Sequence, residues 1–164
     1  MSTSAGVALV ALAYVVHWKG IGPDWLAWRL AQVLALAGLT GLLEPVAPQL
    51  REWTTAGLEQ IAEIVAGVVK SSAYTNAIVE WTPKLAAGFA FLVWFGAFIT
   101  PRASKWLGRI ANQQAKSAIV WGAGVVMVLF GLIAGGNLEA AITWLADLFA
   151  SWGEGLLTWI FGGV

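Results

Sequence analysis

The sequence predicts an all-α integral membrane protein: a helical bundle with about four transmembrane helices plus two amphipathic helices on the external side. The first observation behind this is composition, since the 164 residues are 59% hydrophobic and only 11% charged. A soluble domain carries about 25% charged residues to cover its surface. The second is a set of four long stretches that are poor in charge, and the third is an uneven distribution of Lys and Arg. The length predicts a single membrane domain, residues 1–164.

The first two predicted spans lie near the N-terminus. Residues 4–18 carry no charge, and their apolar run from Ala5 to Val16 follows Ser4, a candidate N-cap. They would extend about 22 Å, which is short for a hydrocarbon core of about 30 Å. A surface-lying first segment, giving three spans, and a signal peptide are the alternatives, although a signal peptide normally begins with a basic region. Residues 25–43 form the second span, and Glu44–Pro48 is expected to end it.

The third and fourth predicted spans are residues 84–100 and residues 117–136. Thr82 and Pro83 suit the N-cap and first position of the third helix, and Pro101 closes it. The fourth stretch has twenty residues without a charge and is the clearest spanning helix in the chain.

Two further segments have the pattern of amphipathic helices. In residues 49–72, apolar or small residues recur every three or four positions, with carboxylates on the other side. This face consists of Leu50, Thr54, Gly57, Ile61, Ile64 and Val68. In residues 138–161, which Asn137 is expected to cap, the apolar seam consists of Leu138, Ile142, Leu145, Phe149, Trp152, Leu156 and Trp159. This seam suits either the lipid boundary or packing onto the bundle or a neighbouring subunit.

The basic residues predict the topology. Arg102, Lys105, Arg109 and Lys116 lie between the third and fourth spans with no acid among them. Short loops rich in Lys and Arg stay in the cytoplasm. Placing this loop inside puts six of the nine basic residues inside and both termini outside. We therefore expect a multi-pass protein of a bacterial inner (cytoplasmic) membrane.

Most tryptophans fall at the predicted membrane boundaries, where their amphipathic rings are favoured. These interface anchors are Trp18, Trp25, Trp28, Trp81, Trp106 and Trp121. Close packing of helices in lipid is expected at small residues of the fourth span. They are Gly122, Gly124, Gly131 and Gly135.

The four basic loop residues are spaced by 3, 4 and 7 positions, so a helix would carry them in one stripe. The simpler interpretation is contact with anionic lipid headgroups. The alternative is a positive ring that lines a lumen after assembly, in which case nucleic acid is a candidate cargo.

No feature of the sequence predicts catalysis, a cofactor or a metal site. The chain has no cysteine, and His17 is its only histidine, which leaves no standard zinc or haem ligand set. No nucleotide-binding or hydrolase motif occurs, and the middle of each predicted span lacks the acids and histidines of proton-coupled carriers.

The layout of residues 78–135 is similar to that of conjugative pilins, which also place both ends outside and a basic loop inside. The likeness is one of topology and transfers no residue role. Together these features favour a non-enzymatic, self-assembling structural or pore-forming subunit of a membrane-spanning transfer or secretion apparatus. Its partners would be the lipid bilayer, copies of itself and other membrane-complex subunits. The alternatives are an accessory subunit of a larger hetero-oligomeric membrane complex and a phage-type holin.

Overall fold

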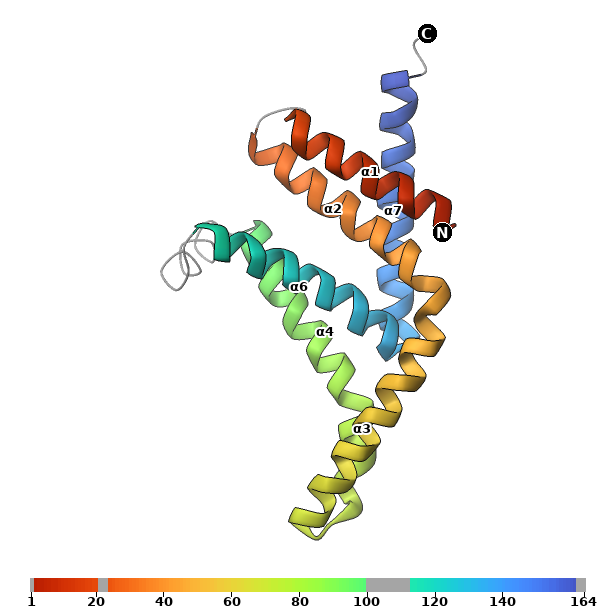
Figure 1. The fold of residues 1–164 in the computed structure, drawn as a ribbon, viewed down its shortest axis with the longest axis vertical. Coiled ribbons are helices and arrows are strands. Elements are labelled where there is room, and N and C mark those ends of the chain that lie inside the picture. Colours follow the sequence, from red (N-terminus) through yellow and green to blue (C-terminus); the bar gives the residue numbers. More distant parts are fainter. Residues whose placement is uncertain (1, 21–23, 100–112, 162–164) are drawn as a thin grey trace. The chain divides into compact units, whose positions relative to one another are not determined.

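Every regular element in the described part of the chain is helical, as Figure 1 shows. The computed structural model describes residues 2–20, 24–99 and 113–161. Its elements are α1 (Thr3–Lys19), α2 (Asp24–Leu43), the 3₁₀ turn η1 (Glu44–Val46), α3 (Ala47–Val69), the 3₁₀ turn η2 (Ser72–Tyr74), α4 (Thr75–Ile99), α6 (Gln113–Ala134) and α7 (Gly136–Phe161). The predicted all-α class is confirmed.

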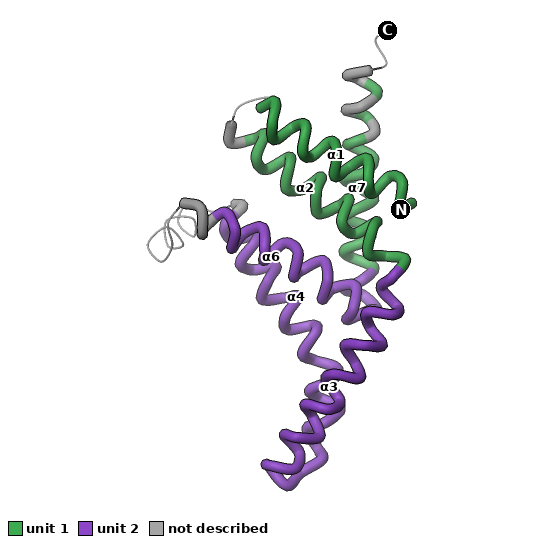
Figure 2. The backbone as a smooth tube through the Cα atoms, in the orientation of Figure 1, with its two compact units in different colours: residues 1–45, 140–164 green, residues 46–139 purple. Residues whose placement is uncertain are grey.

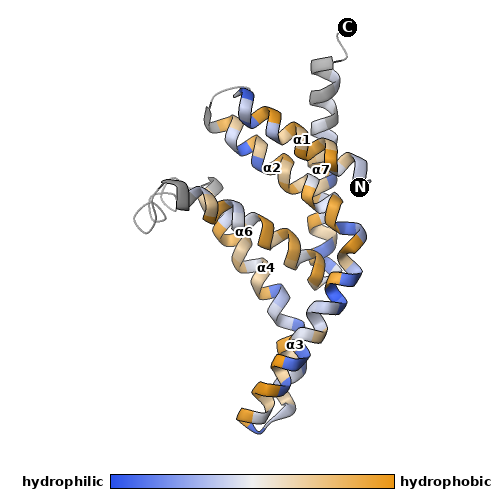
Figure 3. Cartoon of the chain, viewed as in Figure 1, coloured by the Kyte–Doolittle hydropathy of each residue, from blue (hydrophilic) through white to orange (hydrophobic). Residues whose placement is uncertain are grey.

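Three helical stretches in the described residues are long and apolar enough to cross a membrane. They run over Leu26–Val69, Ser72–Ala97 and Ser117–Ala134, and α1 is a shorter apolar helix. Figure 3 shows how hydrophobic residues dominate α6, whereas α3 alternates between hydrophobic and hydrophilic positions. These helices fit a membrane protein, and the number of four spans stays a prediction.

The predicted end of the second helix is confirmed, because α2 ends at Leu43 and the 3₁₀ turn η1 follows before α3 begins at Ala47. Two other predicted helix boundaries are wrong. Pro83 does not start a helix; it lies inside α4, which begins at Thr75. A proline inside a helix lacks its own N–H bond and crowds the carbonyl four residues earlier, which bends a helix without necessarily ending it. Helix α4 also packs against α3. Asn137 lies within α7, which begins at Gly136.

The described chain divides into two compact units, and the single membrane domain stays a prediction. Figure 2 shows them in different colours: unit 1 comprises residues 1–45 and 140–164, and unit 2 comprises residues 46–139. Each unit has its own pattern of packing, described separately below.

Unit 1 is built from α1, α2 and the part of α7 that follows residue 139. Leucines and alanines from these three helices form one buried cluster, with Phe149 packed against it. Its buried members are Leu9, Leu12, Ala13, Val16, Ala31, Leu34, Ala37, Ala146 and Ala150. Small side chains at the crossings let the helix axes approach closely, as they do in membrane proteins.

The closest approach in unit 1 joins α1 and α2 through two glycines. A Cβ atom on Gly38 would lie 2.6 Å from the carbonyl oxygen of Gly6, and a Cβ on Gly6 would lie 2.8 Å from the carbonyl oxygen of Gly38. The third helix makes a similar contact, because a Cβ on Gly153 would lie 2.6 Å from Cδ2 of Leu9. These positions therefore exclude any larger residue without movement of their neighbours.

Unit 2 is organised around α4 and α6, which lie side by side, with α3 packed against both. Figure 1 shows α3 running at a large angle to α6. The chain leaves α3 through Lys70, which has a left-handed backbone (φ 55°) and donates its N–H to the Ala66 carbonyl. It then passes through η2 into α4.

Candidate functional site

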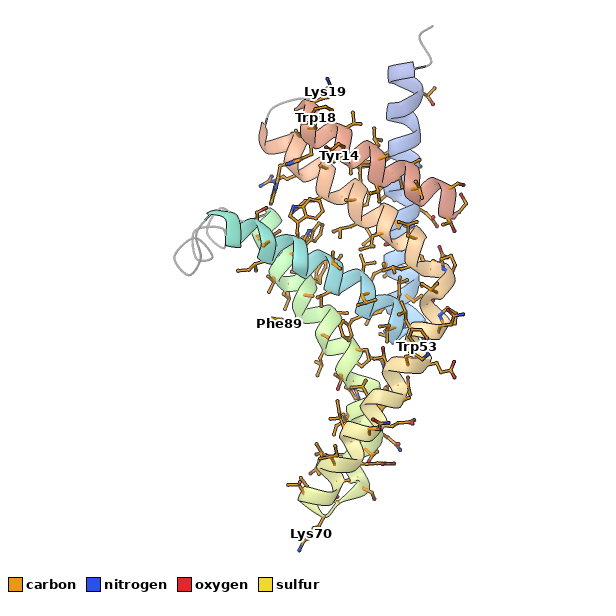
Figure 4. All side chains as sticks on the ribbon, viewed as in Figure 1. Tyr14, Trp18, Lys19, Trp53, Lys70 and Phe89 are labelled. Carbon is orange, nitrogen blue, oxygen red and sulfur yellow. The ribbon has the colours of Figure 1, made fainter. Side chains whose placement is uncertain are left out.

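One face of α4 is apolar and uncovered. Trp81, Leu85, Phe89 and Leu92 are spaced by 4, 4 and 3 residues, so they share a face, and each is between 54 and 72% exposed. We call these four residues the α4 strip. Figure 4 shows Phe89 pointing away from the helices of unit 2. Single exposed apolar side chains are ordinary in soluble proteins, but a continuous row of large ones indicates an apolar environment or a partner.

A second uncovered row lies on α3. Trp53, Ile61, Ile64 and Val68 are between 53 and 79% exposed, and we call them the α3 strip. The sequence predicted Ile61, Ile64 and Val68 as part of an apolar face, together with Gly57, which is also exposed. A different face of α3 packs inward, and Ala62 on that face is fully buried.

A polar clamp holds the junction between α6 and α7 in unit 2. Arg51 of α3 donates from Nε to the Ile133 carbonyl (3.0 Å) and from Nη2 to the Leu132 carbonyl (2.9 Å). The same Nη2 forms a 2.8 Å ion pair with Oε2 of Glu139 in the first turn of α7. The last carbonyls of a helix have no partner within it, so Arg51 satisfies two that α6 leaves open. Its positive charge also suits the C-terminal end of the helix dipole.

Gly135 belongs to this clamp. Its φ of 68° is left-handed, which ends α6, and a Cβ there would lie 3.1 Å from the guanidinium of Arg51. Both facts favour glycine. Sequence reasoning missed Arg51, because a contact across more than 80 residues leaves no periodic signal. The only hint was that Arg51 is the one basic residue between Glu44 and Val69.

An open hollow between α3 and α4 has a volume of about 320 Å³ and an acidic lining. Its lining residues are Glu59, Glu63, Thr75, Asn76, Val79 and Glu80. Glu80 forms a 2.7 Å ion pair with Lys84 one turn further along α4. Within the described residues, no group of three or more His, Cys, Asp or Glu side chains could hold a metal ion. The hollow thus marks the charged flank of the α3–α4 pair.

The predicted basic stripe cannot be compared with the structure. Arg102, Lys105 and Arg109 lie outside the described residues, and Lys116 lies in the first turn of α6, where its side chain is not described. Among the predicted tryptophan anchors, Trp106 is likewise outside and the side chain of Trp25 is not described. Trp18 and Trp81 are exposed, whereas Trp28 and Trp121 are partly buried.

Two of the exposed tryptophans pair with lysines. Nζ of Lys19 lies 5.2 Å from the ring centre of Trp18, and Nζ of Lys84 lies 5.1 Å from that of Trp81. Tyr14 extends the first pair, with its ring centre 6.1 Å from that of Trp18 (Figure 4). Pairs of an aromatic ring and a cation suit the interface between membrane and water, where tryptophan and tyrosine are enriched.

The four predicted packing glycines fall in different surroundings. Gly124 and Gly131 are buried in α6, but Gly122 is exposed with open space where a Cβ would lie, and Gly135 is in the turn after the helix. Gly6 and Gly38, which bring the backbones of α1 and α2 into contact, were not among the predicted packing glycines.

The predicted seam of α7 is only partly buried. Ile142 is buried and Phe149 packs on the core of unit 1, whereas Leu145 and Trp152 are exposed. Leu138 is partly buried, and the side chains of Leu156 and Trp159 are not described. The buried line passes through Ala146, Ala150 and Gly153, so small residues rather than the large ones make the closest contacts.

No protein-family model matches this sequence, and comparison with curated proteins and with solved structures also gave no match.

Proposed function

We propose that this chain is a non-enzymatic, multi-pass membrane protein that assembles with copies of itself into a structural or pore-forming unit. The proposed setting is a transfer or secretion apparatus that spans the bacterial inner membrane. The observation that carries the proposal is the α4 strip, whose large apolar side chains are each more than half exposed in the described chain. Lipid or a second subunit would satisfy them, and water would not.

The dimensions of α4 support a membrane setting. From Trp81, where Lys84 approaches the indole ring, to the end of the helix at Ile99, the rise is about 27 Å. This length is close to the hydrocarbon thickness of about 30 Å. On the N-terminal side of Trp81, Asn76 and Glu80 of α4 line the acidic hollow together with Glu63 of α3. Trp81 thus separates an apolar part of α4 from a polar one, as an interfacial tryptophan would.

Assembly is the less direct part of the proposal. Membrane helices associate through close packing of small residues, and Gly122 on α6 and Gly88 on α4 have open space where a Cβ would lie. They would allow another helix to approach unit 2. The basic residues of 102–116 would then be brought together in several copies, either at lipid headgroups or around a lumen.

The decisive test is the mass of the protein in detergent, measured by light scattering with the bound detergent subtracted. A defined homo-oligomer is expected. A monomer under all mild detergents would contradict self-assembly and favour the accessory-subunit alternative. Replacing Gly122 with Leu should weaken the oligomer, whereas Gly57→Leu on α3, which also faces open space, serves as the matched control.

Conductance across planar bilayers separates a pore from a scaffold. If the basic residues line a lumen, the triple change Arg102→Gln, Lys105→Gln and Arg109→Gln should reduce anion selectivity. Unchanged conductance would assign these residues to lipid headgroups instead. The absence of any conductance from an intact oligomer would rule out the pore.

A further inference from the structure

The two apolar strips of unit 2 lie on the same flank of the α3–α4 pair. Glu59 and Glu63 of α3 and Asn76 and Glu80 of α4 line one hollow, which fixes the position of the acidic flank. Glu59 and Ile61 are two residues apart, which sets them about 200° apart round α3. Ile61 therefore lies across the helix from the hollow, and Ile64 and Val68 continue its line.

The same reasoning applies to α4. Asn76 and Leu85 are nine residues apart, about 180° round the helix. Helices α3 and α4 are antiparallel and share the hollow on one flank of the pair. The side of each helix that lies opposite the hollow therefore belongs to the other flank. Leu85 and Trp81 thus lie on the same flank as Ile61. The α3 strip therefore continues the α4 strip as one apolar surface, with carboxylates on the reverse side.

The direction of α3 decides what this surface can contact. Figure 1 shows α3 at a large angle to α6, and the clamp of Arg51 holds its first turns at the C-terminal end of α6. The part of α4 that shares the hollow with α3 ends at Glu80, three residues before Pro83, a position where helices bend. If α6 and the later part of α4 cross the membrane, α3 therefore runs along its surface.

We infer that α3 is an interfacial helix that lies along the surface of the bilayer. Ile61, Ile64 and Val68 enter the boundary between headgroups and acyl chains, and Glu59 and Glu63 face water. A helix with one apolar side and one charged side is suited to this position. Continuity with the α4 strip favours lipid as the occupant, since a bilayer is the one partner that would cover both strips together. This inference rests on the membrane location proposed for α4.

The experiment uses spin labels at single introduced cysteines, since the chain has no cysteine of its own. The full-length protein is reconstituted in vesicles of phosphatidylcholine and phosphatidylglycerol. Collisions with molecular oxygen, which concentrates in the acyl region, are compared with collisions with a water-soluble nickel chelate. The variants are Ile64→Cys on the apolar flank, Glu63→Cys beside it on the acidic flank, and Phe89→Cys on the α4 strip as the reference.

At positions 64 and 89, collisions with oxygen should be more frequent than collisions with the nickel chelate. At position 63, collisions with the nickel chelate should be the more frequent. Equal exposure of positions 63 and 64 to nickel would overturn the inference. Protection of position 64 from both reagents would also overturn it, because the strip would then be covered by protein; broadening of the spectrum by a second label would identify another copy. Failure at position 89 would contradict the proposed function itself, whereas failure at position 64 alone would contradict only the placement of α3.

Discussion

Glycines on the helices of the two units include two contrasting sets. In unit 1, Gly6 and Gly38 bring α1 and α2 into backbone contact, and Gly153 brings α7 onto the same core. In unit 2, Gly57, Gly88 and Gly122 meet nothing within 4 Å of where a Cβ would lie. The close glycine contacts of unit 1 are thus made within the chain, whereas these glycines of unit 2 are uncovered beside two rows of large apolar residues. Unit 1 also exposes large apolar side chains, Tyr14, Trp18, Trp144 and Trp152 among them, so the contrast between the units concerns their glycine contacts.

The largest effect is expected at the contact between α1 and α2. Gly38→Ala places a methyl group 2.6 Å from the Gly6 carbonyl oxygen and 2.7 Å from Cγ2 of Val10, so the helices must move apart. Overpacking of this kind costs about 3 kcal/mol of unfolding free energy. Unfolding in mixed micelles, followed by tryptophan fluorescence, measures the loss.

The matched control for Gly38→Ala is Gly122→Ala in unit 2. Open space at Gly122 and the higher helix propensity of alanine predict no loss, or a gain of up to about 1 kcal/mol. Equal losses at the two positions would break the contrast between the units.

The next effect concerns the leucine core of unit 1. Leu34 is 2% exposed within the cluster formed with Leu9 and Leu12, so Leu34→Ala opens a cavity. We expect a loss of about 2 kcal/mol, the low end for such changes, because detergent and lipid remove the water-transfer part of the cost. The same unfolding measurement applies, and a loss near zero would show that the core of unit 1 is loosely packed.

The Arg51 clamp tests what holds unit 2 together. Arg51→Gln removes charged hydrogen bonds to two carbonyls and the ion pair to Glu139; the Arg51 side chain is 41% exposed, which weakens the ion pair. The expected loss is about 1.5 kcal/mol, mainly from the bonds to the end of α6. Arg51→Lys should recover only part of it, since one ammonium cannot reproduce the fork of the guanidinium.

Lys84→Gln is the control for the clamp. Its ion pair with Glu80 lies on an exposed face of α4 and spans one helical turn. Such pairs are worth about 0.3–0.5 kcal/mol. If Lys84→Gln costs as much as Arg51→Gln, the clamp is no more than a surface ion pair.

The smallest effect is expected on the α4 strip. Leu92 is uncovered, so Leu92→Ala in detergent should change the unfolding free energy by less than about 0.5 kcal/mol. This is the same substitution as Leu34→Ala, which makes the pair a direct comparison of the two units. A loss at Leu92 as large as that at Leu34 would mean that the strip is buried by protein in the solubilised state.

Local periodicity was the part of the fold that the sequence could reveal. The all-α class, the apolar stretches of α4 and α6 and the face of α3 that carries Ile61, Ile64 and Val68 all follow from residue spacing. Pro83 predicted the start of a helix, but α4 is helical on both sides of it, so a residue that favours a first helical position does not exclude a longer helix. Gly6 with Gly38, and Arg51 with the end of α6, join residues far apart in the chain, and such contacts have no signature in the spacing of one sequence.

The most direct test of the central claim is extraction of membranes that contain the full chain with alkaline carbonate, followed by sedimentation. Carbonate releases proteins that only adhere to a membrane surface and leaves spanning helices in the bilayer. The account predicts that the protein stays in the pellet and leaves it only on addition of detergent. Release into the supernatant, as a monodisperse species without detergent, would contradict the membrane role of unit 2 and the proposals that rest on it.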